Sequence, residues 1–567
     1  MKMRYLEWVR SAACAAFAAV ALAACGGGGG GGGGTPPPTS VTISGDITFD
    51  RIPFDPTFGN GLDPAATAPA PAREVTVQAI DASNSSVIAT ATTDDNGRYS
   101  VTVPVNRNLF IRARAEMVKT GTAPTWNFTV RNNTNADALY ALDGDAASSG
   151  VTNTERDLHA ESGFVGTSYT GTRAAAPFAI LDTVFKAKEL VLSAAPDAEF
   201  PALNLFWSED NRPTAGRFCP NDGDIGTSSY IVFTGEQDDC TPPQTNNPDG
   251  IYVLGDFAVG DTDEFDESVL AHEFGHYVED RFGRSDSIGG EHGGSDSLLD
   301  LRVAFGEGWG NAFSSMVRND PIYRDSFAGV TDDFQVDMES DDPNNEGWFS
   351  EASVEEILWD LFDPANDPSD PGDTLALGFA PIYSVMTGAQ VQTDAVTSIY
   401  TFAAGLRAAN PGSAAQIDDL LTQEKIFGSD DFGAGETNDA GDPGILPIYK
   451  TILLNAPISV CSRMPDGSTD ANKVGNRVLL RFDNDAQRLV TITAAGAVNG
   501  GGTVAATDPD IFVLRRGTLA AFGVSSTANS ETISQQPLAA GTYIIEVYDF
   551  NIAGTQPRCM SVSIQGN

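Results

Sequence analysis

The chain has 567 residues and a formal net charge of -44, because 77 Asp and Glu residues outnumber 33 Lys and Arg residues. So large a negative charge argues against nucleic acid as a partner, since phosphates would be repelled. A chain of this length is expected to bury several cores, and we predict a multidomain α+β protein.

Residues 1–24 have the pattern of an export signal. Basic residues near the start precede an Ala-rich apolar run at residues 12–24, which is too short for a membrane span. The run ends Leu-Ala-Ala-Cys, which resembles the bacterial lipobox and implies that Cys25 becomes the lipidated first residue of the mature chain. The alternative is an ordinary signal peptide, cut after a small residue.

Residues 25–40 are rich in Gly and then in Pro, which is typical of a tether. We therefore expect an exported bacterial lipoprotein, held at a membrane of the cell envelope by its lipid. If Cys25 is not lipidated, we expect a secreted protein.

Residues 41–117 alternate apolar and polar side chains in short runs, separated by turn signals such as Asp-Asp-Asn-Gly at residues 94–97. This period of two predicts an N-terminal β-sandwich. The Asp-Asn-Gly-Arg-Tyr-Ser hairpin resembles the carboxypeptidase regulatory-like and transthyretin-like domains. The segment carries no catalytic group of residues, so we expect a spacer, adhesion or purely stabilising role.

Four cysteines lie beyond the signal and the lipidation site: Cys219, Cys240, Cys461 and Cys559. An even number in an exported chain predicts two disulfides, which we assign as Cys219 with Cys240 and Cys461 with Cys559. Neither pair has zinc-finger spacing, so a cysteine zinc site is not expected.

Residues 118–457 are predicted to form a central α+β domain. Residues 175–193 have the period of an amphipathic helix, and residues 203–207, 230–233 and 251–256 have the pattern of strands.

A short motif in this domain carries chemistry. His272 and His276 are four residues apart, so on a helix their imidazoles project from one face and can bind one zinc ion. Glu273 would lie beside that ion, where its carboxylate can take a proton from zinc-activated water. Because the chain has only four histidines, an accidental match is improbable. The motif therefore predicts a metallopeptidase.

A catalytic zinc site uses three protein ligands and leaves a position open for water. Glu307 is the expected third ligand, because its setting Gly-Glu-Gly-Trp-Gly, in a helix predicted over residues 302–316, lets a second backbone approach closely. Asn311, one turn further on, is placed to hydrogen-bond a ligating histidine. A surface position is the alternative for Glu307. The rival ligands are His292, Asp296 and Asp300.

His-Glu-Phe-Gly-His, followed by Gly-Glu-Gly-Trp-Gly-Asn-Ala-Phe, resembles the gluzincin metallopeptidases and most of all their fungalysin branch. The resemblance implies zinc ligation by His272, His276 and Glu307, with Glu273 as the general base. The family usually has Asp where this chain has Asn311, so support of the histidine would be uncharged.

Gluzincins commonly hold an extended substrate against an exposed strand edge near the metal, where main-chain pairing suits many peptide sequences. Tyr252, Val253 and Leu254 are our candidate for this edge, and a wholly internal strand is the alternative.

His292 and Tyr400 are the candidate donors to a transition-state oxyanion. Tyr383 and Tyr449 are rival donors. The alternative is a loop cap for the histidine and a core position for each tyrosine.

Four further helices are predicted downstream, at residues 351–362, 381–391, 396–409 and 415–427. Residues 363–373 and 429–442 are acidic loops, in which calcium binding and simple solvation are the competing interpretations.

Residues 458–567 return to a strand pattern and predict a C-terminal β-sandwich. Asp-Pro-Asp-Ile-Phe-Val-Leu at residues 508–514 and the Gly-Thr-Tyr strand near residue 542 resemble the bacterial pre-peptidase C-terminal domains. This resemblance implies a jelly-roll-like sandwich of the kind commonly attached to secreted proteases.

These observations together predict an exported zinc-dependent metalloendopeptidase that acts on protein or peptide substrates, with calcium as a candidate second ion. One alternative is a surface-binding or adhesion lipoprotein in which the metallopeptidase fold is only a scaffold. Another is a different zinc-dependent amide hydrolase.

Overall fold

The computed structural model describes residues 38–566, apart from gaps at residues 234–239, 245–246, 294–297, 328–330, 341–345, 365–373, 466, 468–469, 497–506 and 553–555. Ser40–Asn567 form one compact unit. The predicted signal peptide, Cys25 and most of the tether lie outside the described residues. No helix within the described ranges is long and apolar enough to cross a membrane.

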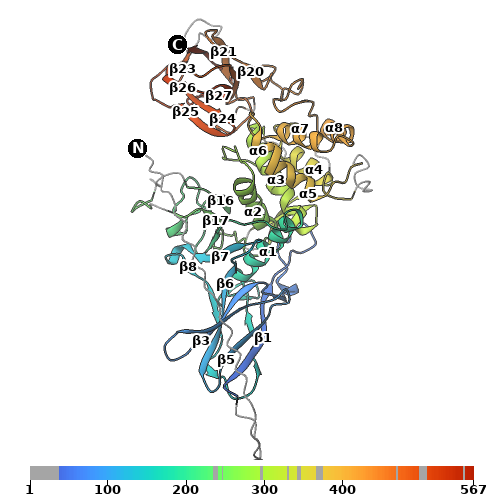
Figure 1. The fold of residues 1–567 in the computed structure, drawn as a ribbon, viewed down its shortest axis with the longest axis vertical. Helices are drawn as coiled ribbons and strands as arrows, with labels where there is room; N and C mark the ends of the chain where they lie inside the picture. The colour runs from blue at the N-terminus through green and yellow to red at the C-terminus, as the bar shows by residue number, and fades with distance from the viewer. Residues whose placement is uncertain are drawn as a thin grey trace, which may run out of the picture. The chain divides into compact units, whose positions relative to one another are not determined.

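The N-terminal half of the chain is built on two β-sheets (Figure 1). The smaller sheet contains β1 (Ser40–Arg51), β2 (Ala68–Pro71), β5 (Arg98–Pro104), β11 (Thr154–Glu155) and β12 (Leu158–Ala160). The larger sheet has the order β16-β17-β15-β7-β6-β3-β4. Its strands are β16 (Ser229–Ile231), β17 (Gly250–Val253), β15 (Leu203–Trp207), β7 (Trp126–Asn132), β6 (Asn108–Lys119), β3 (Val75–Asp81) and β4 (Val87–Thr92), with the short β8 (Ala138–Leu139), β9 (Ala141–Asp143) and β10 (Ala147–Ser148) paired to β6 and β7.

The larger sheet crosses the domain boundary that the sequence predicts after residue 117. Strand β6 runs through that boundary and pairs with β7, which pairs in turn with β15 of the central region. Phe128 of β7 packs edge-on against Phe274, with the ring centroids 5.8 Å apart. Residues 41–117 therefore do not form a separate sandwich. Strands β3, β4 and β6 belong to the larger sheet, and side chains from both sheets lie in one hydrophobic core with the central region.

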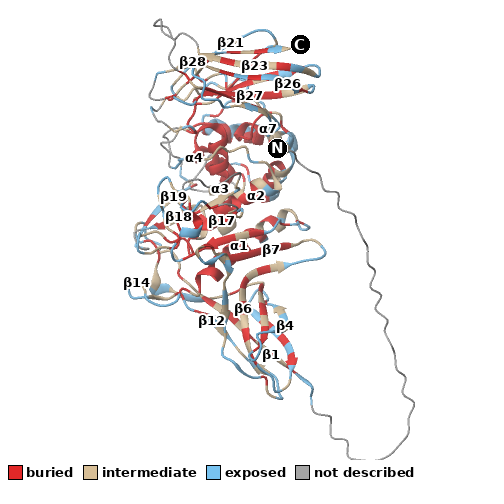
Figure 2. Cartoon of the chain, turned by 90° about the vertical axis from the view of Figure 1, so that its left-hand side faces the viewer, coloured by how far each residue is buried: buried red, intermediate tan, exposed pale blue. Residues whose placement is uncertain are grey.

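Helices form most of the remaining central region, and they carry many of its buried residues (Figure 2). They are α1 (Ala176–Ala194), α2 (Glu267–Phe282), α3 (Leu301–Arg318), α4 (Glu351–Asp360), α5 (Phe379–Ser384), α6 (Gln390–Gln392), α7 (Ile399–Ala409) and α8 (Ala414–Gln423). Two short hairpins accompany them, β13 (Phe164–Val165) with β14 (Ser168–Tyr169) and β18 (Ile322–Phe327) with β19 (Asp332–Asp337). Besides α2, which carries His272 and His276, the sequence predicts six helices, and all six are present within a few residues of their expected bounds. The helix expected at residues 381–391 is interrupted by a π-helical turn at Val385–Ala389.

The C-terminal region is a β-sandwich of two sheets, whose strands are antiparallel apart from one pair, with a core of its own. One sheet contains β20 (Tyr449–Thr451), β22 (Val478–Asn484), β27 (Gly541–Asp549), β24 (Pro509–Arg515) and β25 (Thr518–Gly523). The other contains β21 (Ile458–Ser462), β28 (Arg558–Gly566), β23 (Arg488–Gly496) and β26 (Ser530–Leu538). The first strand, β20, precedes the predicted boundary at residue 458 and runs parallel to β22, so the sandwich begins earlier than the sequence suggests.

Both predicted disulfides are confirmed, Cys219–Cys240 and Cys461–Cys559. The second joins β21 to β28, where the two cysteines stand directly opposite each other in the antiparallel ladder.

A buried ion network joins α3 to the C-terminal sandwich. Asp300 caps α3 and binds the Arg302 guanidinium, with Nε–Oδ1 and Nη2–Oδ2 distances of 2.8 and 2.9 Å. The same guanidinium donates from Nη1 to Glu546 of β27 at 2.6 Å, and Arg477 also pairs with Glu546. Because Arg302 and Glu546 are each 2% exposed, this network is shielded from solvent.

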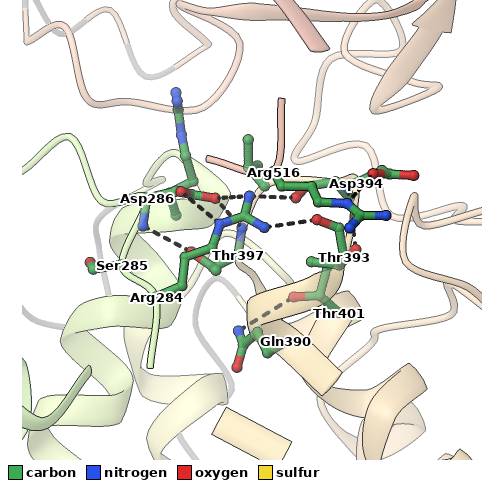
Figure 3. Close-up of polar contacts among 12 residues, drawn as sticks. Arg284, Ser285, Asp286, Gln390, Thr393, Asp394, Thr397, Thr401 and Arg516 are labelled. Atoms are coloured by element: carbon green, nitrogen blue, oxygen red, sulfur yellow. Dashed lines mark hydrogen bonds and ion pairs between the residues drawn. The ribbon is translucent and has the colours of Figure 1, made fainter. Parts of the chain in front are cut away.

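The segment that follows α2 is tied to a loop between α6 and α7 (Figure 3). Arg284 donates to the backbone carbonyl oxygens of Thr393 and Ala395, both at 2.8 Å. Arg516, in the turn between β24 and β25, pairs with Asp394 of the same loop at 2.8 Å. The loop between α6 and α7 is thus held by contacts from two parts of the chain far apart in sequence.

We expect Glu546→Ala to lower the free energy of unfolding by about 3 kcal/mol, because it leaves the buried Arg302 without one of its two partners. Urea denaturation of the full chain measures this loss. Asp418→Ala is the control, since the Arg407–Asp418 pair is exposed and its removal should change the free energy of unfolding by less than about 1 kcal/mol. Equal losses in the two variants would contradict the importance of the buried network.

Candidate metal centre

Three side chains from two neighbouring helices converge. His272 and His276 of α2 bring their Nε2 atoms to 3.0 Å from each other. Glu307 Oε2 of α3 lies 3.4 Å from the first and 3.2 Å from the second. Two ligand atoms at about 2.1 Å from a zinc ion, at the tetrahedral angle, are about 3.4 Å apart. The spacing of this ligand triangle therefore suits one metal ion of that size.

Glycines on α3 allow the two helices to come this close. A Cβ at Gly310 would lie 2.7 Å from Cε1 of His272, and a Cβ at Gly308 would lie 2.6 Å from Cβ of Val354 on α4. Either contact is too short for a carbon atom. Glycine at these two places lets α3 bring Glu307 against α2 while α4 supports its other side.

Hydrogen bonds orient the ligands. Nδ1 of His272 lies 2.7 Å from Oδ1 of Asn311, an acceptor, so Nδ1 carries the proton and Nε2 keeps its lone pair for a metal. The amide nitrogen of Asn311 donates in turn to Glu355 at 2.6 Å, which fixes the amide orientation. For His276, the buried Glu279 lies 4.0 Å from Nδ1 on the same helix.

The electrostatics of the ligand triangle favour a cation. Burial lowers the pKa of His276, but the charge of Glu307 and hydrogen bonds to Glu279 and Glu307 outweigh it and raise this pKa well above its ordinary value. Burial raises the pKa of Glu307, yet the charge of His276 and a hydrogen bond from that residue hold it well below its usual range. Glu307 is therefore an ionised carboxylate in a buried site.

Glu273, between the two histidines in sequence, is not part of the ligand triangle. Its carboxylate accepts a hydrogen bond from the backbone N–H of Tyr230 on β16 at 2.5 Å. It lines the same cleft as the ligands and is 7% exposed. A carboxylate held beside a metal site but outside the ligand set is available for proton transfer.

The ligand triangle lies in a cleft of about 790 Å³. Its walls come from α2, α3, α4, the loop before α2, strand β16 and the β18–β19 hairpin. His292 enters this cleft, with Nε2 at 3.4 Å from Glu307 Oε2 and Nδ1 at 3.2 Å from Glu351 Oε2. It is not among the three residues whose ligand atoms all lie within 4.8 Å of one another.

The rival ligands are accounted for in part. Asp300 caps α3 and forms an ion pair with Arg302, so it is not a ligand. Asp296 lies outside the described residues.

The predicted substrate edge is wrong. Tyr252 and Val253 lie on β17, which pairs with β15 on one side and with β16 on the other, and Leu254 follows it. Tyr252 is buried and stacks on Phe206, with ring centroids 4.7 Å apart. Within the part of the chain that the structure describes, the terminal strand of this sheet is β16, whose Ser229 and Tyr230 line the cleft.

The predicted role of Tyr400 as an oxyanion donor does not fit its position. Its buried hydroxyl donates to Glu436 at 2.7 Å, away from the residues that line the cleft. Tyr383 and Tyr449 do not line the cleft either. Two tyrosines do line it: Tyr230 of β16, whose hydroxyl donates to Asp280 at 2.7 Å, and Tyr323 of β18, whose ring centroid lies 6.1 Å from that of His272.

Sequence reasoning missed Glu279, Tyr230 and Tyr323. A signal existed for Glu279, since a residue three places after a ligating histidine lies on the same helical face. For Tyr230 and Tyr323 the position depends on strand pairing across long stretches of chain, and no local pattern reveals it.

The acidic loops show no sign of a calcium site where the structure describes them. In the loop at residues 429–442, Asp430 accepts from the backbone N–H groups of Phe432 and Ala434. Glu436 likewise accepts several backbone hydrogen bonds. These carboxylates stabilise a turn-rich loop. Most of the other loop, residues 365–373, lies outside the described residues.

No protein-family model and no curated protein matches the sequence. Among solved structures, the chain is similar to the pre-peptidase C-terminal domain of a collagenase from Bacillus anthracis, with 14% identity over 20% of this chain and 93% of that chain and a TM-score of 0.16. A candidate carbohydrate-binding protein from Pseudomonas aeruginosa matches with 14% identity over 21% and 88%, and a TM-score of 0.13. A 9R-lipoxygenase from Cyanothece matches with 10% identity over 28% and 25%, and a TM-score of 0.12. These similarities assign no family to the chain.

We expect Asn311→Ala to weaken metal affinity by about 10–100-fold, because it frees the imidazole of His272 to rotate and change tautomer. Competition between the protein and a zinc-binding dye measures this affinity. Asn311→Asp keeps the acceptor for His272. Because burial raises the pKa of Glu355, a protonated Glu355 can donate to the new carboxylate in place of the lost amide, so this variant should retain most of the affinity. An unchanged affinity in Asn311→Ala would show that the hydrogen bond does not orient the ligand.

Proposed function

We propose that this protein is a zinc-dependent metallopeptidase of the gluzincin type, with His272, His276 and Glu307 as ligands. The observation that carries the proposal is the ligand triangle of two imidazoles and one carboxylate, with Glu273 beside it in an open cleft. Nitrogen and oxygen ligands in a tetrahedral arrangement suit zinc.

A bound zinc ion would polarise a carbonyl oxygen and lower the pKa of water in the cleft. Glu273 then acts as the general base: its carboxylate takes a proton from the attacking water and delivers it to the nitrogen of the leaving amine. The N–H of Tyr230 holds this carboxylate in position. Asn311 and Glu279 hold the two imidazoles.

Strand β16 is the element on which an extended substrate would pair. It is the terminal strand of the larger sheet, and its residues line the cleft beside the ligand triangle. Main-chain hydrogen bonds to a free strand edge bind peptides of many sequences. This arrangement supports protein or peptide substrates and cleavage within a chain.

Export remains part of the proposal. Two disulfides within the described residues suit an oxidising compartment, in agreement with the signal and lipobox patterns of the first 25 residues. The competing proposal, a surface-binding lipoprotein that uses the fold as a scaffold, gives no role to the carboxylate of Glu273.

The decisive variant is Glu273→Gln, which keeps the shape of the side chain but removes its basicity. We expect it to retain about one zinc per chain and to lose at least about two orders of magnitude in kcat for casein or a peptide library. Glu189→Gln, at a half-exposed position on α1, is the matched control and should keep full activity. Absence of peptidase activity in the zinc-loaded parent protein would favour the scaffold proposal.

Tyr323 and His292 are the cleft residues placed to donate to an oxyanion. Removal of one such donor typically lowers kcat by about 10²–10³-fold, so we expect Tyr323→Phe or His292→Gln to show a loss of this size. Steady-state kinetics with a fluorogenic peptide, alongside zinc content, separate the two residues. If neither variant changes kcat, the donor lies elsewhere in the cleft.

A further inference from the structure

Three more aspartates meet in the wall of the same cleft, apart from the ligand triangle. Asp261 and Asp263 lie in the loop before α2, and Asp325 lies on β18. One carboxylate oxygen from each lies within 4.8 Å of the other two. A backbone bridge between Asp261 and Phe327 holds the loop against the strand. We call these three residues the aspartate cluster.

One oxygen of each residue in the aspartate cluster lacks a donor among the described residues. The Oδ1 atoms of all three residues are buried and accept no hydrogen bond from the described residues. Asp263 is 3% exposed, and its other oxygen is already occupied by the hydroxyl of Ser228. A buried carboxylate without a donor or a counter-charge is costly, which points to a missing positive partner.

The groups that face the aspartate cluster do not supply that partner. Asp266 is the nearest further carboxylate, but both of its oxygens accept from Ser326, at 2.7 and 3.1 Å. Arg324, the neighbour of Asp325 in sequence, places its guanidinium over the ring of Phe54. Burial raises the pKa of Asp325 to about 7, and burial together with neighbouring carboxylates raises that of Asp263.

We propose that Asp261, Asp263 and Asp325 bind a calcium ion in the wall of the cleft. The cluster offers only carboxylate oxygens, which suit a hard cation and not zinc or copper. Calcium takes six to eight oxygens in flexible geometry, so water from the cleft can complete its coordination. Magnesium demands a stricter octahedron and gives up its own water reluctantly.

The ion would have a structural effect on the cleft. Side chains two residues apart on a strand share a face, so Asp325 and Tyr323 both point to the cleft. The backbone N–H of Arg324, which lies between these two residues, donates to the hydroxyl oxygen of Ser268 on α2 at 3.0 Å. A calcium ion adds a bond from Asp325 to the loop before α2, and it thereby fixes the strand that carries Tyr323.

The test separates this site from the ligand triangle by using the full chain with His272→Ala and His276→Ala in every sample. After chelator treatment, calorimetric titration with Ca²⁺ should show one ion per chain, and Tm should rise with Ca²⁺. Asp325→Asn should weaken the affinity at least about tenfold, because one charged ligand is lost, and should abolish most of the rise in Tm. Asp332→Asn, an exposed position on the same hairpin, is the control and should behave as the parent.

The change in Tm that we expect for Asp325→Asn has the opposite sign when Ca²⁺ is absent. Without Ca²⁺, Asp325→Asn should have a higher Tm than the parent, because neutralising one carboxylate relieves repulsion in the cluster. Two results would overturn the proposal: Ca²⁺ binding that Asp325→Asn leaves unchanged, or no binding and no change in Tm for the parent. Saturation by Mg²⁺ at the same concentrations as Ca²⁺ would overturn the assignment of calcium. Because no sample holds the histidine site, none of these outcomes depends on peptidase activity.

Discussion

The close contact between α2 and α3 is the constraint on which the candidate metal centre depends. Where His272 faces Gly310, the imidazole occupies the space that any larger side chain on α3 would need. This contact brings Glu307 within 3.4 Å of both ligand nitrogens. The same face of α3 presents Asn311 to His272, so one helix provides both a ligand and the group that orients another ligand.

Different groups compensate the negative charge of the carboxylates in different parts of this acidic chain. At the contact between α3 and the C-terminal sandwich, buried carboxylates pair with Arg302 and Arg477. In the loop at residues 429–442, backbone N–H groups satisfy the carboxylates. In the cleft, one oxygen of each carboxylate in the aspartate cluster has no such partner among the residues that the structure describes. Bound cations there would neutralise charge that the fold leaves uncompensated, which links metal binding to the stability of the cleft walls.

The sequence predicts well those features that depend on local spacing. These features involve residues within a few helical turns of one another. They are the spacing of His272 and His276, the spacing of Glu307 and Asn311 by one helical turn, and the helical period of residues 175–193. The strand edge was wrong because β16 and β17 pair across a segment of nearly 20 residues whose folding no local period describes. The domain boundary at residue 117 failed for the same reason, since only the pairing of β7 with β15 shows that the sheet continues. Tyr323 reaches the cleft through a hairpin that the sequence pattern does not distinguish from a loop.

X-ray absorption at the zinc K-edge of the purified full-length protein is the measurement that tests the metal centre most directly. We expect about one zinc per chain, bound only by nitrogen and oxygen atoms at about 2.0–2.1 Å, with the outer-shell scattering of two imidazole rings. Glu307→Ala should alter the first shell while the two imidazole signatures persist. A spectrum without two imidazoles, or a protein that retains no zinc after purification in its presence, would contradict the account.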